Sequence, residues 1–385
     1  MRKFVVLFYC AVISVFVLAA EKNPLLSEFY KGNLQNKITV VGKASSSGNT
    51  QVILKALDFL VFAYDSLGDD AEFESLAEAV IKSLTPKTFE GNEKNISNQL
   101  FQLFKISTGN KIKISVIDSF YSLPGSDAVV LVNDYFYRQM QNRGKFDESV
   151  SKSVEFMGIK GNSASFNRLF IADILEIWPE QSVFISENYA KLAEENRKEI
   201  LQMIVSVPAD KKILILKKLN SNEKISKKIR GECAENVLSS IINKEEGNSK
   251  DSREDLITLE LLCLETISQS KWTRASSLST KCFDRIRSEY DQNLVTTEQF
   301  TGAIADIASV AASDTVVVLS SYLDYLNKCA ENGQTPVRDV VLSVINSLGE
   351  LGDNRAFDFI YAATSLDYPE EVVEAAKSAI KKLKW

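Results

Sequence analysis

Apolar residues recur every three or four positions along most of this chain, which is the spacing of one face of an α-helix. Two stretches show the spacing clearly: Phe73, Leu76, Ala77, Val80, Ile81 and Leu84, and Val337, Val340, Val341, Val344, Ile345 and Leu348. Alternation with a period of two, which is typical of a β-strand, is scarce. Its best candidate is the short segment Lys37–Val41. The pattern therefore predicts an all-α fold.

Proline marks the boundaries of the predicted helices. All seven prolines fall between apolar-periodic stretches or at their first turn, where proline breaks no helical hydrogen bond. They are Pro24, Pro86, Pro124, Pro179, Pro208, Pro336 and Pro369. No predicted helix is interrupted.

Parts of the chain resemble one another in sequence. Ser343–Leu348 reads SVINSL and Ser115–Phe120 reads SVIDSF. Each is followed by a short turn, an aspartate and a second apolar-periodic run, which starts after Asp353 in one copy and after Asp127 in the other. Asp314 precedes a similar run about 40 residues before Asp353, and this is the period of a two-helix repeat.

The turn around Gly352 and Asp353 predicts a tight connection between two helices. Glycine can adopt the left-handed conformation that ends a helix, and aspartate can accept hydrogen bonds from the free N–H groups of the next one. A similar LGD sequence stands at 67–69. Asp367 and Glu370 have the spacing of a capping box before the last apolar-periodic run.

The segment Val337–Leu383 resembles the HEAT-like repeat of the phycobilisome-lyase type. It has the VR start of that repeat at 337–338, the LGxLGD turn at 348–353 and the alanine-rich following helix around 374–376. The resemblance implies an α-solenoid of HEAT/armadillo-like helical hairpins that presents a long concave surface to protein partners. Lyases of this type attach bilins, but nothing in this chain supplies a pigment-specific signature, so we expect no cofactor.

The N-terminus has the features of a secretory signal. Arg2 and Lys3 precede an uncharged apolar run at 4–18, which is shorter than a membrane-spanning helix, and two alanines follow it. We expect a signal peptide at 1–20, cleaved after Ala19 or Ala20; an uncleaved anchor is the alternative. The signal, the Lys/Asn-rich composition and the repeat type predict an exported bacterial protein, periplasmic or associated with the cell envelope.

The rest of the chain divides at a charged segment. We expect degenerate HEAT-like repeats at 21–242, a charged loop at 243–255 with Gly247 and Ser249, and C-terminal HEAT-like repeats at 256–385. The formal charge is −6, from 51 acidic and 45 basic residues, so the protein as a whole carries no positive field that would gather nucleic acid.

Histidine is absent from the whole chain. That excludes Ser-His-Asp and Cys-His catalysis and nearly all catalytic zinc sites, which use imidazole. No phosphate-binding glycine loop or dinucleotide fingerprint occurs. The adjacent carboxylates at 69–70, 194–195 and 245–246 could in principle serve glycosidase chemistry, but they stand in polar, solvated stretches. The sequence therefore predicts no enzyme, cofactor or metal.

Four cysteines remain after removal of the signal: Cys233, Cys263, Cys282 and Cys329. If helices at 256–266 and 276–290 form an antiparallel hairpin that turns near Lys271, Cys263 and Cys282 come close enough for a disulfide. Four buried thiols are the alternative.

Positive charge is concentrated in one segment. Between Asp210 and Arg230 only Asp210 and Glu223 oppose eight cations, which are Lys211, Lys212, Lys217, Lys218, Lys224, Lys227, Lys228 and Arg230. Such a face can bind an acidic partner, polymer or lipid headgroup. Two ordinary helices with lysine-rich solvent faces are the alternative.

The sequence as a whole predicts an exported, non-catalytic scaffold that binds other proteins. Exposed positions on the second helices of the hairpins are the candidate contacts; Asp324, Tyr325, Arg355 and Asp358 are examples. The second hypothesis is an envelope-associated module that binds an anionic polymer or lipid through 211–230.

Overall fold

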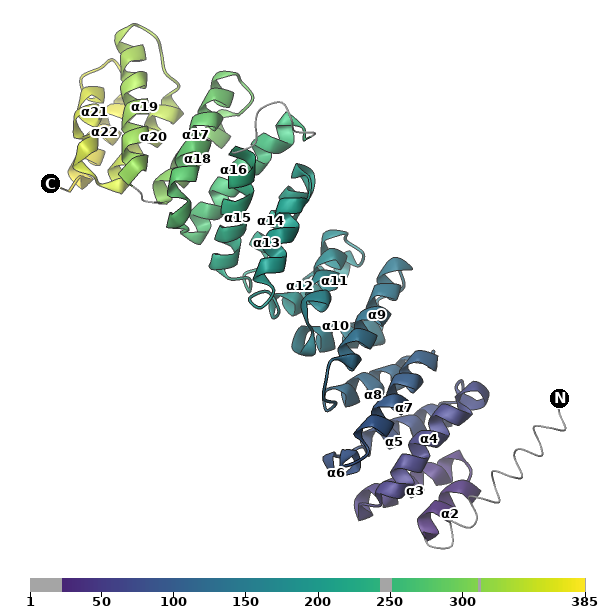
Figure 1. Ribbon diagram of the computed structural model, residues 1–385. Coiled ribbons are helices and arrows are strands. Elements are labelled where there is room, and N and C mark those ends of the chain that lie inside the picture. The colour runs from purple at the N-terminus through teal and green to yellow at the C-terminus, as the bar shows by residue number, and fades with distance from the viewer. Residues whose placement is uncertain (1–22, 243–250, 311–312, 385) are drawn as a thin grey trace. The chain divides into compact units, whose positions relative to one another are not determined.

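The computed structural model describes residues 23–242, 251–310 and 313–384 (Figure 1). Within these ranges the chain forms α-helices and three short 3₁₀ helices, with no β-strand, in a solenoid-like arrangement of packed helices. The predicted fold class is confirmed. The predicted signal peptide at 1–20 lies outside the described residues.

The first compact unit comprises the residues up to Leu192. Its helices are α2 (Pro24–Lys31), α3 (Leu34–Ser47), α4 (Thr50–Leu67), α5 (Ala71–Lys82), α6 (Pro86–Phe89), α7 (Glu93–Ile106), α8 (Asn110–Phe120), α9 (Asp127–Gln141), α10 (Glu148–Lys160), α11 (Ser163–Ile174) and α12 (Ser182–Ala190). The proposed strand Lys37–Val41 is wrong, because it lies inside α3. Lys37, Val40, Val41 and Ala44 are buried there at helical spacing.

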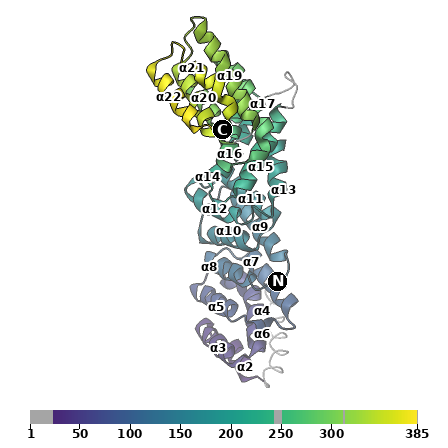
Figure 2. The same cartoon turned by 90° about the vertical axis from the view of Figure 1, so that its left-hand side faces the viewer.

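Helices of the first unit alternate between two layers. The hairpins α2/α3, α4/α5, α7/α8, α9/α10 and α11/α12 each give one helix to either layer. The second helices α3, α5, α8, α10 and α12 pack side by side, as do α2, α4 and α7, and α9 and α11. Figure 2 shows α3, α5, α8 and α10 on one side of this unit and α4, α7 and α9 on the other.

The second compact unit begins at Ala193. Its helices are α13 (Arg197–Ser206), α14 (Ala209–Ser221), α15 (Lys227–Ile242), α16 (Arg253–Ser270), α17 (Ser276–Asp291), α18 (Thr297–Ser309), α19 (Ser313–Glu331), α20 (Arg338–Leu351), α21 (Phe357–Ala363) and α22 (Glu370–Lys382). The odd-numbered helices form its first-helix layer and the even-numbered ones its second-helix layer. Of the predicted loop at 243–255, residues 253–255 form the first turn of α16, while 243–250 lie outside the described part.

Nine turns between helices in the described part of the chain contain one residue in the left-handed conformation. In six of them the residue after the left-handed one donates its backbone N–H to the carbonyl of the residue five positions before it in the chain. This bond gives a partner to a carbonyl at the C-terminal end of the helix that would otherwise have none. Two of these six residues are the glycines Gly48 and Gly333, and four are not glycine: Arg143, Glu176, Lys271 and Asn293. The turn predicted near Lys271 is confirmed.

The predicted turn at Gly352 is also confirmed, with φ at +67°, and the Asp353 carboxylate accepts from the Arg355 N–H at 2.9 Å. This turn joins successive hairpins, α19/α20 and α21/α22, rather than the two helices of one hairpin. The 67–69 copy differs, because Gly68 is right-handed and Asp70 caps α5. The predicted capping box at 367–370 is wrong: α22 begins at Glu370, with Pro369 as its N-cap.

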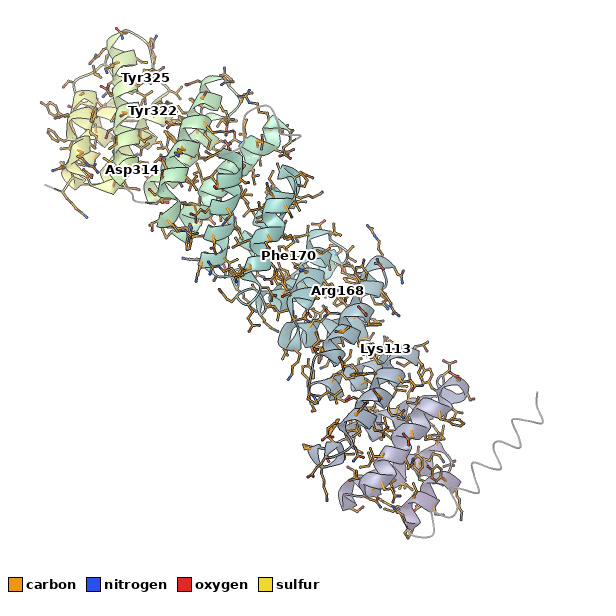
Figure 3. The ribbon with its side chains drawn as sticks, in the orientation of Figure 1. Lys113, Arg168, Phe170, Asp314, Tyr322 and Tyr325 are labelled. Carbon is orange, nitrogen blue, oxygen red and sulfur yellow. The ribbon has the colours of Figure 1, made fainter. Side chains whose placement is uncertain are left out.

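Buried lysines occur at the fourth residue of three second helices. Lys37, Lys113 and Lys212 are 6%, 9% and 3% exposed. The Lys37 ammonium donates to the carbonyls of Phe29 and Gly32, each at 2.6 Å, at the end of α2. Lys113 (Figure 3) donates to the carbonyl of Ser107 at the end of α7. Carbonyls at a helix C-terminus lack an intrahelical partner, so each of these two ammonium groups links a helix to the one before it.

We predict that Glu176→Gly stabilises the first unit. Glu176 is exposed, with φ at +49°, where a side chain costs about 1–2 kcal/mol and glycine costs nothing. Glycine's greater freedom in the unfolded chain offsets part of this, which leaves a gain of about 0.5–1 kcal/mol. Denaturant unfolding followed by circular dichroism measures it. Glu180→Gly, at an exposed position in the adjacent 3₁₀ helix, should lower the free energy of unfolding. An equal change in both variants would contradict backbone strain at Glu176.

Candidate interaction surface

Exposed large apolar side chains lie mainly on the first helices of the hairpins. Those of the first-helix layers are Phe62, Val130, Tyr137, Ile171, Leu175, Val205, Val317, Tyr325 and Tyr361. The second-helix layers expose Ile159, Val183 and Leu214, and Leu294 and Val337 lie in turns. Exposed apolar groups that gather on one side of a protein mark interaction surfaces. The first-helix layers are therefore the candidate interaction surfaces of the two units.

The clearest group lies in the first unit, on the neighbouring helices α9 and α11. Val130 and Tyr137 of α9 are 52% and 38% exposed; Ile171 of α11 and Leu175, which caps the end of α11, are 37% and 56% exposed. Their spacings of seven and four residues place each pair on one side of its helix. We call these four residues the α9/α11 face.

An ion pair joins the two helices beside this face. Both terminal nitrogens of the Arg168 guanidinium lie 3.2 Å from one oxygen of Asp134, and the guanidinium lies 5.1 Å from the centre of the Tyr137 ring. Figure 3 labels Arg168 on its helix. The arginine is thus held by a carboxylate and by an aromatic face. The pair links α9 to α11 beside the α9/α11 face.

The contact residues expected from the sequence lie in the first-helix layer and not on second helices. Asp324 pairs with Lys328 at 2.6 Å on α19, and Arg355 forms a forked pair with Asp353. Tyr325 is 56% exposed and stacks on Tyr322, with ring centres 6.1 Å apart (Figure 3). Asp358 is exposed on α21.

The basic segment 211–230 does not form one continuous cationic face. Lys212 is buried, and the Arg230 guanidinium donates to the carbonyl of Asn220 at 3.3 Å. Lys211 pairs with the neighbouring Asp210. Lys211, Lys217, Lys224, Lys227 and Lys228 are exposed on and between α14 and α15, and Lys218 is half-buried. Anion binding by these six lysines stays a prediction.

The adjacent carboxylates at 69–70 and 194–195 are exposed, as expected for solvated groups. The pair at 245–246 lies outside the described residues. A buried carboxylate that the sequence reading missed is Glu260 on α16. Its side chain is fully buried, 2.9 Å from the Arg285 guanidinium of α17, and Glu289 is buried nearby. A fully buried side chain cannot reach a substrate, so we expect Glu260 to affect the stability of the fold and its dependence on pH.

Burial raises the pKa of Glu260 to about 7; the Arg285 charge opposes this shift and the Glu289 charge adds to it. The pKa in the folded protein thus exceeds the ordinary value of 4.5. The stability linked to protonated Glu260 is therefore complete below pH 4.5 and is lost as the pH rises through 7.

We predict that Glu260→Gln, which stays neutral, removes this loss. At pH 8 the variant should be more stable than the native protein by about 1–3 kcal/mol, and at pH 5 the two should be similar. Denaturant midpoints measured at both pH values test this. The exposed Glu350→Gln is the control, and a constant difference between Glu260→Gln and the native protein at both pH values would refute the titration.

Three of the four cysteines are fully buried, Cys233, Cys263 and Cys282, and all four are free thiols in this structure. Cys263 and Cys282 lie on α16 and α17, which pack together. Burial raises the pKa of the Cys233 thiol to about 12 and also raises those of Cys263 and Cys282. Thiols with such pKa values react slowly, because the thiolate is the reactive form. The Cys263–Cys282 disulfide stays a prediction.

Thiol titration of the mature protein distinguishes the two states. With all four thiols free, we expect only the half-buried Cys329 to react quickly in the native protein, and three more to react after denaturation without reductant. A Cys263–Cys282 disulfide would remove two of these three. Cys263→Ser is the matched variant: it should lower the denatured count by one if the thiols are free and raise it by one if the pair is bonded.

No helix in the described part of the chain is long and apolar enough to cross a membrane. A scan against models of protein families found no match, and a search of curated proteins found no relative.

Proposed function

We propose that this protein is an exported, non-catalytic HEAT-like repeat scaffold that binds other proteins in the periplasm or cell envelope of a bacterium. The observation that carries the proposal is the α9/α11 face, where four apolar side chains are exposed on two adjoining helices. The basic residues and apolar run at the N-terminus support export, and the LGxLGD turn at 348–353 supports the repeat type.

The α9/α11 face has the composition of a binding hot spot. Tyrosine and arginine are enriched at such sites, and tyrosine buries a large area with little loss of conformational freedom. Here Tyr137 and Arg168 are already held against each other, and Arg168 against Asp134. A partner that covers this face therefore orders few side chains on binding, which lowers the entropic cost.

We predict that the double variant Tyr137→Ser, Leu175→Ser loses the partner. Removing two central apolar anchors should cost about 1–3 kcal/mol each, enough to abolish capture at moderate affinity. The measurement is affinity capture of the mature protein from its native envelope after mild crosslinking, read by mass spectrometry. Ile159→Ser, at a 60% exposed position of the second-helix layer, is the control. Retention by the double variant, or equal loss with Ile159→Ser, would contradict this face as the contact.

The second candidate function is binding of an anionic polymer or lipid through the exposed lysines of 211–230. The observation that favours it is the set of six lysines on and between α14 and α15 that remain accessible. Each lysine near an anionic surface contributes about 1 kcal/mol. Substituting Lys217, Lys224, Lys227 and Lys228 with glutamine should release the protein from anionic vesicles, and unchanged retention would reject this candidate.

A further inference from the structure

An open hollow of about 590 Å³ lies in the second unit, where α17 turns into α18. Tyr290 and Asp291 at the end of α17, Asn293 and Leu294 of the turn, and Val337 before α20 are among the residues that line it. A lysine or arginine side chain occupies only part of this volume. The hollow can therefore take a short peptide segment.

The aromatic wall of the hollow is held rigidly. Tyr290 stacks on Phe300, with ring centres 4.4 Å apart and planes at 13°, and its hydroxyl lies 3.3 Å from that of Thr297. Leu294 and Val337 line the hollow and are 45% and 47% exposed. Tyr290 offers a π system to a cation, and the two aliphatic side chains offer contacts to an apolar group.

The charge in this region is negative. Asp291 is exposed at the C-terminal end of α17, where the helix dipole adds partial negative charge. Burial is the main cause that raises the pKa of Tyr322 on α19, and the hydrogen bond with Cys329 is the main cause that raises the pKa of Tyr325; the Asp291 charge adds to both shifts. These tyrosines therefore lie within the field of the hollow's carboxylate.

Cations near the hollow are engaged by other groups. The Arg287 guanidinium lies over the Tyr322 ring at 5.8 Å, and Arg253 donates to the Gln292 side chain at 2.9 Å. The N-terminus of α18, which would favour an anion, is closed by a capping box of Thr296 and Gln299 and carries Glu298 in its first turn. The hollow therefore favours a positively charged occupant.

We propose that this hollow binds a segment of a partner protein that carries lysine or arginine next to an apolar side chain. The cation would lie between Asp291 and the Tyr290 ring, and the apolar group would cover Leu294 and Val337. This assignment rests on the proposed scaffold function and names the chemistry of one contact. Because carboxylate and aromatic groups attract a cation together, binding should weaken as salt rises.

The test uses the full mature chain and a labelled peptide of about ten residues with two arginines and two leucines, against the same peptide with glutamates in place of the arginines. Fluorescence anisotropy should detect binding of the arginine peptide only. Asp291→Asn should weaken it about tenfold, the effect of roughly 1.4 kcal/mol. Asp358→Asn, at an exposed acid of α21 outside the lining of the hollow, should not. Equal binding of the two peptides, or an unchanged affinity of Asp291→Asn, would overturn the assignment.

A photo-crosslinking amino acid at position 294 or 137 separates this assignment from the scaffold function. Position 294 lines the hollow, and position 137 lies on the α9/α11 face. Partners crosslinked from both positions support both proposals when the peptide selectivity also holds. Partners crosslinked from position 137 only overturn the hollow and leave the scaffold standing. If neither position gives a crosslink, both proposals are overturned.

Discussion

The burial of each helix's apolar stripe against neighbouring helices is the interaction on which the rest of this structure depends. In α20, Val340, Val341, Val344, Ile345 and Leu348 are at most 1% exposed, because α18 and α22 flank the helix and α19 packs across it. No single hairpin can bury such a stripe alone, so stability comes from each hairpin's contacts with its neighbours. The same arrangement leaves part of the first-helix layers exposed, and most of the exposed large apolar residues lie there.

Helix ends supply the second constraint, because their free carbonyls need partners. Buried lysines satisfy them at the ends of α2 and α7, and left-handed turns satisfy them at six others. Both devices carry a cost: burial lowers the pKa values of Lys37 and Lys113, and four turns place a residue other than glycine at positive φ. These bonds hold neighbouring helices together, so exposed side chains such as Tyr137 and Arg168 have defined positions in the absence of a partner.

The sequence predicted the helices well, because apolar spacing reports burial over a dozen or more residues. It failed at Lys37–Val41, where a window of five residues cannot separate two periods. It also placed Lys212 on a solvent face, because charge alone does not reveal burial. The overlooked signal is a shared sequence pattern: each of Lys37, Lys113 and Lys212 is followed by isoleucine, one further residue and then two aliphatic residues. The α9/α11 face could not be predicted, because it depends on which helices become neighbours. Nor could the place of the Gly352 turn be predicted, because the sequence LGD occurs both within a hairpin, at 67–69, and between two hairpins, at 351–353.

The central claim is that partners bind on the first helices of the hairpins. Hydrogen–deuterium exchange of the mature protein, with and without a captured partner, tests it most directly, because exchange reports protection helix by helix. We predict added protection in first helices, most of all in α9 and α11, and little change in α10 and α12. Protection confined to second helices, or to the lysine-rich segment of α14 and α15, would contradict it.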